Sequence, residues 1–134
     1  MSFFEFPHRV TYAETDKMGF AYYANYLVWF EIGRTELIRA SGLAYRELEE
    51  MGINLPVIEA SCRYKKPVKY DDLITIRTAV TEFEGIRLGF SYEITRDGQV
   101  LAEGRTLHAF MDGNGRPRKL PPEIRTRLTE ALSK

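Results

Sequence analysis

The sequence has few of the residues that cross-link a chain or bind metals. It contains one cysteine, Cys62, so no disulfide can form within the chain, and only two histidines, His8 and His108. One thiol and two imidazoles are too few for the usual zinc clusters. A lone cysteine is also typical of reducing compartments. We therefore expect no metal, no other cofactor and a cytoplasmic location.

Long apolar runs and an excess of one charge are missing as well. No run of apolar residues reaches the length that a membrane-spanning helix needs. The first residues lack the basic and apolar regions of a secretory signal. Lys and Arg number 19, as do Asp and Glu, whereas a nucleic-acid-binding domain is usually basic. We expect no membrane span and no nucleic-acid partner.

The composition itself is that of an ordinary globular protein. The 134 residues are 44% hydrophobic and 28% charged, close to the averages for such proteins. The length fits one domain, and no internal repeat or low-complexity linker interrupts it. We expect a single domain over residues 1–134.

Alternation of apolar and polar residues predicts five strands. The first covers residues 4–12 and contains Pro7, which favours an edge of the sheet. Turn residues at Glu84-Gly85 and Asp97-Gly98 predict hairpins. We expect the last four strands to follow one another as hairpins in an antiparallel sheet. These four strands cover residues 58–65, 74–81, 86–95 and 100–111.

A long helix is predicted over residues 25–40, with Asn25 as its N-cap and Gly42 just after its end. Residues 26–30 are apolar on nearly every side, which predicts a helix buried on most faces. A long sheet and one apolar helix must bury each other. The sequence therefore predicts an α+β fold in which the sheet curls around this helix.

Shorter helices are predicted over residues 45–51 and after Pro121, which suits a first helical turn together with Pro122.

The strongest chemical signal is the loop that runs into the long helix. Asp16 lies nine residues before Asn25, and a helix N-terminus offers free N–H groups and a positive dipole end. Such donors can hold a carbonyl oxygen that becomes an oxyanion. A carboxylate beside them is the second part that acyl hydrolysis needs. By spacing alone, a simple turn-capping role for Asp16 is favoured.

A wider pattern adds to this signal. It consists of Arg9-Val10, Thr15-Asp16, Gly19, Tyr22, Asn25-Tyr26-Leu27, Glu31 and Arg34-Thr35-Glu36. The pattern resembles the 4-hydroxybenzoyl-CoA thioesterase family of hotdog-fold proteins, and within it the acyl-CoA thioesterase branch linked to the Tol-Pal cluster. The likeness continues through residues 64–72 and Leu120-Pro121, so it covers essentially the whole chain.

The resemblance implies a hotdog fold and an enzyme that hydrolyses a small or medium acyl-CoA to free acid and CoA. The family's catalytic carboxylate falls on Asp16, acting as nucleophile or general base. The backbone N–H near Tyr23 would polarise the thioester carbonyl. Many members of this branch carry histidine at position 23, and a tyrosine side chain is a poor proton shuttle near pH 7. We therefore expect Tyr23 to contribute mainly through its backbone.

The resemblance also implies a substrate-binding set and a partner. Gly19, Tyr22 and Asn25 are expected at the substrate, and Lys66 and Arg87 at the CoA phosphates. For each cation alone, a solvated position on the surface is the simpler interpretation. Similar proteins pair sheet to sheet, so a homodimer or a homotetramer built as a dimer of dimers is expected.

Two other functions stay open on the same fold. An acyl-thioester dehydratase usually has a histidine in this loop, which the sequence lacks here. A non-catalytic acyl-CoA-binding module would not need Asp16. Glu31 in the helix is the second candidate for the catalytic carboxylate, although a structural pairing with Arg34 or a neighbouring subunit is favoured. The sequence leaves the acyl group open, and also whether CoA or an acyl-carrier protein carries it.

Overall fold

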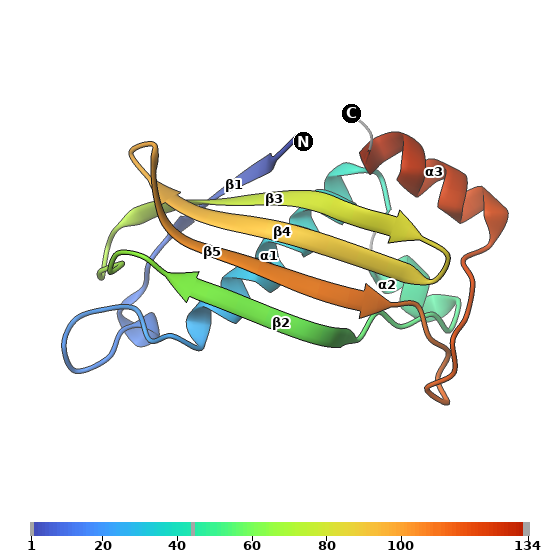
Figure 1. Cartoon of the computed structure of the whole chain (residues 1–134), viewed down its shortest axis with the longest axis horizontal. Helices are drawn as coiled ribbons and strands as arrows, with labels where there is room; N and C mark the ends of the chain where they lie inside the picture. The colour runs from blue at the N-terminus through green and yellow to red at the C-terminus, as the bar shows by residue number, and fades with distance from the viewer. Residues whose placement is uncertain (1, 44, 133–134) are drawn as a thin grey trace.

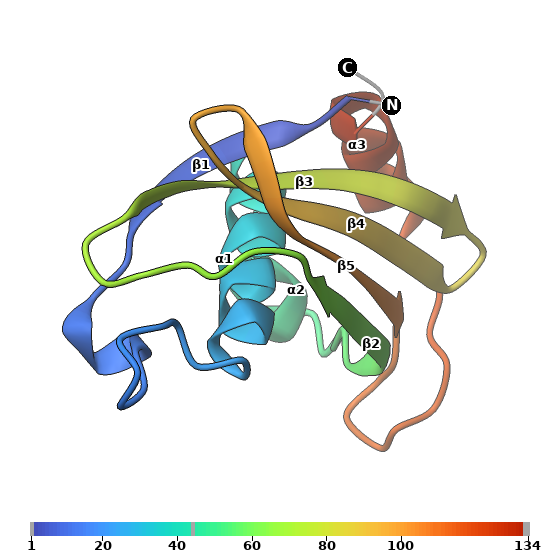
Figure 2. The same ribbon diagram turned by 60° about the vertical axis from the view of Figure 1, so that its left-hand side comes forward.

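A computed structural model describes residues 2–43 and 45–132 of the chain. Its main feature is one antiparallel sheet with the strand order β1-β3-β4-β5-β2. The sheet curls around helix α1, as the two views show (Figures 1 and 2). This confirms the predicted α+β arrangement. The strands are β1 (Phe4–Arg9), β2 (Val57–Tyr64), β3 (Leu73–Glu84), β4 (Arg87–Arg96) and β5 (Gln99–Ala109).

Two of the predicted hairpins are confirmed. Strands β4 and β5 are joined at Asp97 and Gly98, whose φ angles are 53° and 78°. Positive φ at both central residues is the geometry that twisted hairpins favour. Strands β3 and β4 meet at Gly85, with a φ of 58°. Pro7 lies in β1, which pairs only with β3, so its position on an edge strand is also confirmed.

The predicted hairpin between the second and third strands is wrong. Strand β2 pairs with β5, and β3 pairs with β1, so β2 and β3 are separated by two strands. Residues 65–72 carry the chain across the end of the sheet (Figure 1). Alternation shows that a segment is a strand, but it does not select the neighbour. That choice depends on how far the connection reaches and on which edge is open.

Helix α1 (Asn25–Ala40) lies against the inner face of the sheet. Trp29, Phe30 and Ile38 are fully buried on this side, which matches the spacing of one helix face. The opposite side differs from the prediction, because Leu27 is 43% and Val28 48% exposed. The sheet of one chain covers only one side of the helix, so this apolar surface is left beside the edge strand β2.

Helices α2 (Tyr45–Glu50) and α3 (Pro122–Leu132) confirm the two shorter predicted helices and lie at the end of the sheet away from the loop before α1 (Figure 1). Arg127 of α3 donates to the carbonyl of Gly42, and Arg125 donates to that of Gly85. These bonds attach α3 to the turn after α1 and to the β3–β4 hairpin. None of the described helices is long and apolar enough to cross a membrane.

The buried His108 makes the stability of the fold sensitive to pH. Its Nε2 lies 2.8 Å from Thr106 Oγ1, and its Nδ1 lies 3.3 Å from the Leu55 carbonyl oxygen. Burial, helped by the positive charge of Arg34, lowers the pKa of His108 from 6.5 to about 4. The neutral imidazole therefore belongs to the folded state, whereas the unfolded chain takes up a proton below pH 6.5.

We expect His108 to lower the free energy of unfolding by up to about 3 kcal/mol as the pH drops from 6.5 to 4. The sign follows because the unfolded state binds more protons in that range. Urea unfolding of the wild type and of His108→Gln at pH 7, 6 and 5 measures it. The variant should lose part of the slope, because it lacks the imidazole that takes up this proton on unfolding. Equal slopes for both proteins would contradict the prediction.

Candidate active site

The loop that carries Asp16 begins with a turn that the sequence pattern did not reveal. The first strand was predicted to continue to Tyr12, but β1 ends at Arg9 and a 3-10 helix, η1, covers Tyr12–Glu14. The reason is local, because the backbone N–H of Thr11 donates to the carboxylate of Glu14 over 2.7 Å. That bond folds the chain back, so residues 15–24 can pass in front of the start of α1.

Asp16 holds its own turn together with only one of its two carboxylate oxygens. Oδ1 accepts from the N–H groups of Met18 (2.9 Å) and Phe20 (3.2 Å). Gly19, with a φ of 82°, allows the tight return. Among the described residues, Oδ2 has no hydrogen-bond partner. The turn role expected from spacing is therefore present, and it leaves one oxygen available for chemistry.

The same turn occurs a second time in the chain, away from this loop. Asp112 accepts from the N–H groups of Asn114 and Arg116 at Oδ1, over 2.8 and 3.0 Å. Gly115 has a φ of 77° there, like Gly19 in the first turn. The difference between the two aspartates is their surroundings, since Asp16 lines a pocket with aromatic walls.

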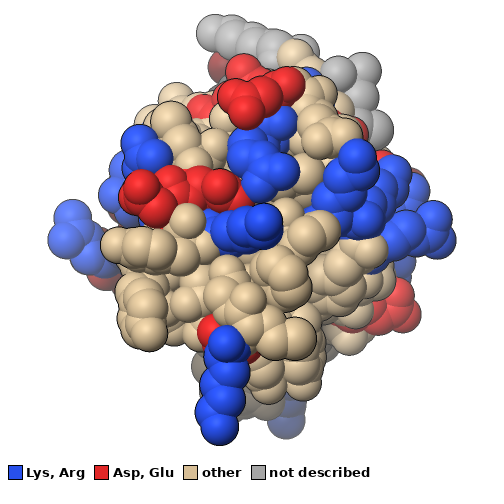
Figure 3. Space-filling model, turned by 90° about the vertical axis from the view of Figure 1, so that its left-hand side faces the viewer, with Lys and Arg blue, Asp and Glu red and all other residues tan. Residues whose placement is uncertain are grey.

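That pocket has a volume of about 380 Å³. It lies where the Asp16 loop, the start of α1 and the end of β2 meet. At this end of the molecule, a broad area without charged side chains lies beside groups of Lys and Arg (Figure 3). The lining residues are Asp16, Phe20, Ala21, Tyr22, Tyr23, Tyr26, Tyr64, Lys65, Lys66 and Pro67.

Four tyrosines give the pocket its character. The rings of Tyr22 and Tyr23 lie 4.6 Å apart, and those of Tyr26 and Tyr64 lie 4.8 Å apart. Burial, with a smaller effect from Cys62, raises the pKa of Tyr26 and of Tyr64 to about 12. A hydrogen bond with Tyr23 raises the pKa of Tyr22. These three phenols stay protonated at neutral pH, so they supply hydrogen-bond donors and not bases.

The N-terminus of α1 differs from the prediction in one detail. The residue before the helix is Ala24, without a side-chain cap, so the predicted cap at Asn25 is wrong. Asn25 is the first helical residue, and its Nδ2 donates to the Glu14 carbonyl oxygen over 2.8 Å. The side chain thus binds the loop and is not available to cap its own helix.

The backbone donors at this terminus are partly free. The N–H groups of Asn25 and Tyr26 donate to the carbonyls of Tyr22 and Tyr23. Within residues 2–43 and 45–132, the N–H of Tyr23 has no hydrogen-bond acceptor. The hydroxyl of Tyr64 donates to the Tyr23 carbonyl over 3.2 Å, which fixes the following peptide. A free N–H beside the positive end of a helix dipole can bind a developing oxyanion.

The structure brings most of the predicted site residues together. Asp16, Tyr22, Tyr23 and Lys66 line one pocket. Gly19 forms the turn of Asp16, and Asn25 holds the loop in place.

The two predicted phosphate-binding cations lie apart. Lys65 and Lys66 both line the pocket, and Lys65 is paired with Glu103 over 2.6 Å. Arg87 lies at the far end of β4 and is paired with Glu82 over 3.0 Å. About seven strand residues, or roughly 23 Å, separate it from the end of the sheet near Asp16. Within one chain, Arg87 is not part of this pocket.

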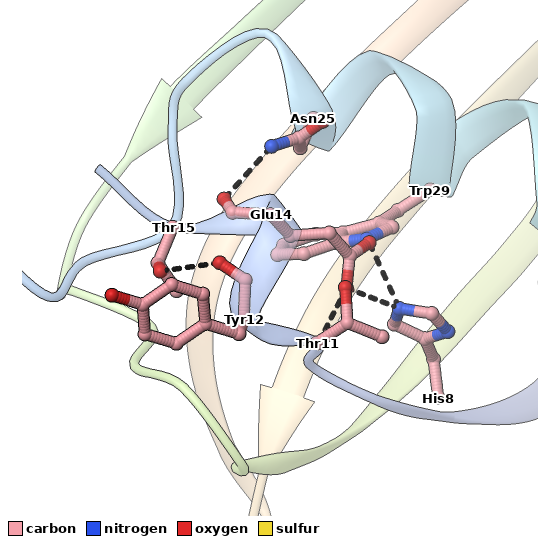
Figure 4. A network of polar contacts seen from close by, with 7 residues as sticks. All are labelled: His8, Thr11, Tyr12, Glu14, Thr15, Asn25 and Trp29. Atoms are coloured by element: carbon pink, nitrogen blue, oxygen red, sulfur yellow. Dashed lines mark hydrogen bonds and ion pairs between the residues drawn. The ribbon is translucent and has the colours of Figure 1, made fainter.

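Three residues of this region were not identified as site residues from the sequence. Glu14, His8 and Trp29 form a polar network at the residue where the loop of residues 15–24 begins (Figure 4). The indole N–H of Trp29 was the available signal, because a buried indole needs an acceptor. By contrast, Glu31 is exposed and makes no ion pair with Arg34 in the described part of the chain, so the expected pairing with Arg34 is wrong. The alternative, a pairing with a neighbouring subunit, stays a prediction. Nor do three or more His, Cys, Asp or Glu side chains in this part gather as metal ligands.

Comparison with known proteins gives a consistent result. The family model described as the thioesterase-like superfamily matches residues 10–128. A putative acyl-CoA thioesterase, YneP, of Bacillus subtilis is 38% identical over 77% of this chain and 75% of its own length. The acyl-CoA thioesterase YbgC of Haemophilus influenzae is 33% identical over 91% of both chains.

A solved structure agrees with these relatives. The DHNA-CoA thioesterase of Staphylococcus aureus superposes with a TM-score of 0.93 at 29% identity. The superposition covers 99% of this chain and 93% of that one. The sheet wrapped around α1 is therefore the hotdog fold that the sequence predicted.

Proposed function

As this chain belongs to the thioesterase-like superfamily, we propose that it hydrolyses the thioester of a small or medium acyl-CoA to a carboxylic acid and free CoA. One observation carries the proposal. A half-buried carboxylate, Asp16, has one oxygen fixed and one free in an aromatic pocket that also holds the unpaired N–H of Tyr23.

The geometry suggests how the two groups divide the reaction. The thioester oxygen accepts from the Tyr23 N–H, so negative charge develops beside the helix dipole. Oδ2 of Asp16 either attacks the carbonyl carbon or removes a proton from a water that does. In the first route the C–S bond breaks as an acyl–Asp16 anhydride forms, and water then cleaves this anhydride to release the acid and restore the Asp16 carboxylate. In the second route water adds to the carbonyl carbon and the C–S bond breaks directly. In both routes the thiolate takes up a proton that comes from the water and leaves as CoA. Both routes consume one water.

Release of free thiol from a panel of acyl-CoAs tests the proposal. The panel runs from acetyl to palmitoyl and includes benzoyl types, with the same acyl groups on acyl-carrier protein as a second arm. Turnover of at least one small or medium acyl-CoA is expected. Binding without thiol release would indicate an acyl-CoA-binding module, and formation or loss of a double bond would indicate a dehydratase. Either result would contradict the proposal.

Lys66 is expected to bind the phosphates of CoA at the mouth of the pocket. Lys66→Ala should raise KM about two- to fivefold at low salt and leave kcat nearly unchanged, as loss of an exposed charge contact does. The difference should shrink as salt screens the charge. Lys119→Ala is the control, because Lys119 is an exposed lysine that does not line this pocket. Arg87→Ala belongs in the same series, and its predicted role requires a second subunit to bring it to the substrate. A KM that stays at the wild-type value in Lys66→Ala at low salt would contradict the prediction.

We also propose that the active form is a homodimer or a dimer of dimers. Strand β2 is an open edge, and unpaired edges favour pairing with another chain. Val57 of β2 is 46% exposed and lines one hollow with the exposed Leu27 and Val28 of α1, and Ile58, the next residue of β2, is 48% exposed. This apolar surface is continuous with the open edge, so one partner would cover both.

Light scattering over a hundredfold concentration range measures this assembly. We expect a mass of two or four times 15.5 kDa, and we expect Ile58→Lys to shift it toward the monomer. A wild-type mass of 15.5 kDa at every concentration would contradict the proposal. The Tol-Pal-linked branch and the cytoplasmic location stay predictions.

A further inference from the structure

We propose that Glu14 is the positioning residue of this active site, holding the Asp16 loop in register with the first turn of α1. The inference rests on the proposed function, because it concerns the placement of Asp16. Glu14 lies at the centre of the contacts in Figure 4, between strand β1 and helix α1. It does not line the pocket itself, so it acts through the loop and not on the substrate.

The carboxylate of Glu14 joins three separate segments. Oε1 accepts from the backbone N–H and the hydroxyl of Thr11, over 2.7 and 3.1 Å. Oε2 accepts from the indole N–H of Trp29 over 2.6 Å. Nε2 of His8 lies 3.0 Å from both oxygens. One carboxylate is therefore in hydrogen-bonding contact with β1, with the turn before η1 and with the buried side of α1.

The backbone carbonyl of Glu14 closes the same loop from its other end. It accepts from the N–H of Tyr22 over 2.8 Å and from Nδ2 of Asn25 over 2.8 Å. The loop of residues 15–24 thus begins directly after Glu14, and its other end is hydrogen-bonded to the Glu14 carbonyl oxygen. Asp16 is two residues after the start of this loop, and Tyr23 is next to its closing contact. Glu14 therefore holds both ends of the segment that carries these two groups, and the bond from the Ala21 N–H to the Val68 carbonyl supports its middle.

The charge of Glu14 suits this task. Burial raises its pKa, but the donors Thr11, Trp29 and His8 outweigh that effect and lower the pKa below the ordinary value. At neutral pH both oxygens are therefore acceptors. A glutamine has the same shape but only one acceptor oxygen, so its amide nitrogen would face the N–H of Thr11 or of Trp29. Trp29 is fully buried, and water cannot easily replace the lost acceptor.

Small displacements of a catalytic group have large consequences for rate. We expect Glu14→Gln to lower kcat by about 10- to 100-fold while KM changes by less than about threefold. In an Asp16→Asn background the same substitution should lower kcat by a clearly smaller factor, because the part of its effect that acts through Asp16 is already lost. A variant that merely unfolds part of the protein would lower activity by the same factor in both backgrounds. Glu49→Gln, an exposed carboxylate on α2, is the control and should match the wild type.

Trp29 provides a readout that does not need activity. It is the chain's single tryptophan, so one indole N–H resonance in a ¹H–¹⁵N spectrum reports its bond to Glu14. We expect Glu14→Gln to shift this resonance and Glu49→Gln to leave it in place. If Glu14→Gln does not fold, Asn25→Ala tests the contact that the Glu14 carbonyl oxygen makes with the Asn25 side chain. We expect this variant to lower kcat about three- to tenfold.

The outcomes separate this inference from the proposed function. If the wild type is active and the folded Glu14→Gln variant has the same kcat, the inference is overturned and the thioesterase function stands. If Glu14→Gln does not fold, a wild-type kcat in Asn25→Ala has the same meaning. An unmoved indole resonance, or an additive loss in the Asp16→Asn background, also overturns it. A wild type that hydrolyses no acyl thioester overturns the proposed function, and the positioning role with it.

Discussion

Asp16→Asn is expected to lower kcat for thioester hydrolysis by at least about 10²-fold, the low end of what a positioned acid or base contributes. The amide keeps the oxygen that accepts from Met18 and Phe20, so the turn should persist. It replaces Oδ2 by a nitrogen that is neither a nucleophile nor a base. Thiol release, a thermal melt and binding of a non-hydrolysable acyl-CoA analogue are measured together.

The chain supplies its own control for this experiment. Asp112→Asn makes the same chemical change in a turn with the same two N–H contacts and the same positive-φ glycine. Asp112 does not line the pocket, so this variant should keep wild-type kcat. A folded Asp16→Asn protein that binds and hydrolyses like the Asp112 variant would reduce Asp16 to a turn residue. Glu31 would then be the next carboxylate to replace.

Gly104→Ala is expected to lower the free energy of unfolding by about 2–4 kcal/mol, because it forces extra volume into a packed core. A Cβ at this position of β5 would lie 2.2 Å from Cε2 of Phe30 and 2.9 Å from the carbonyl oxygen of Ser61. The Phe30 ring cannot move aside, since it is fully buried and stacked 4.4 Å from the ring of Tyr92. Helix α1 therefore rests directly on the backbone of β5 at this point.

Urea unfolding measures this effect, with Gly113→Ala as the control. A Cβ at Gly113 meets nothing within 4 Å, and its φ is not in the left-handed region, so a change within about 0.5 kcal/mol is expected there. Equal stability of the two variants would show that the contact between α1 and β5 is looser than these distances imply.

The sequence identified most of the elements because their signals are local. The alternation along β3, β4 and β5 predicts strands whatever surrounds them, and Asp97-Gly98 permits the positive φ angles that the hairpin needs. The end of α1 before Gly42 follows in the same way. The place of Asp16 at the site came from the resemblance, since by spacing alone it looked like a turn residue, and Asp112 shows that such a turn can exist without a pocket.

The tertiary structure decided what depends on distant parts of the chain. Strand β2 joined β5 instead of β3, Arg87 lies far from the pocket, and Gly104 is required by a ring 74 positions earlier in the chain. Glu14 contacts His8 on β1 and Trp29 on α1, and no local sequence pattern relates these residues to it. The physical reason is that period and turn chemistry act between near neighbours, whereas strand pairing, close packing and shared hydrogen bonds form only when separate segments meet.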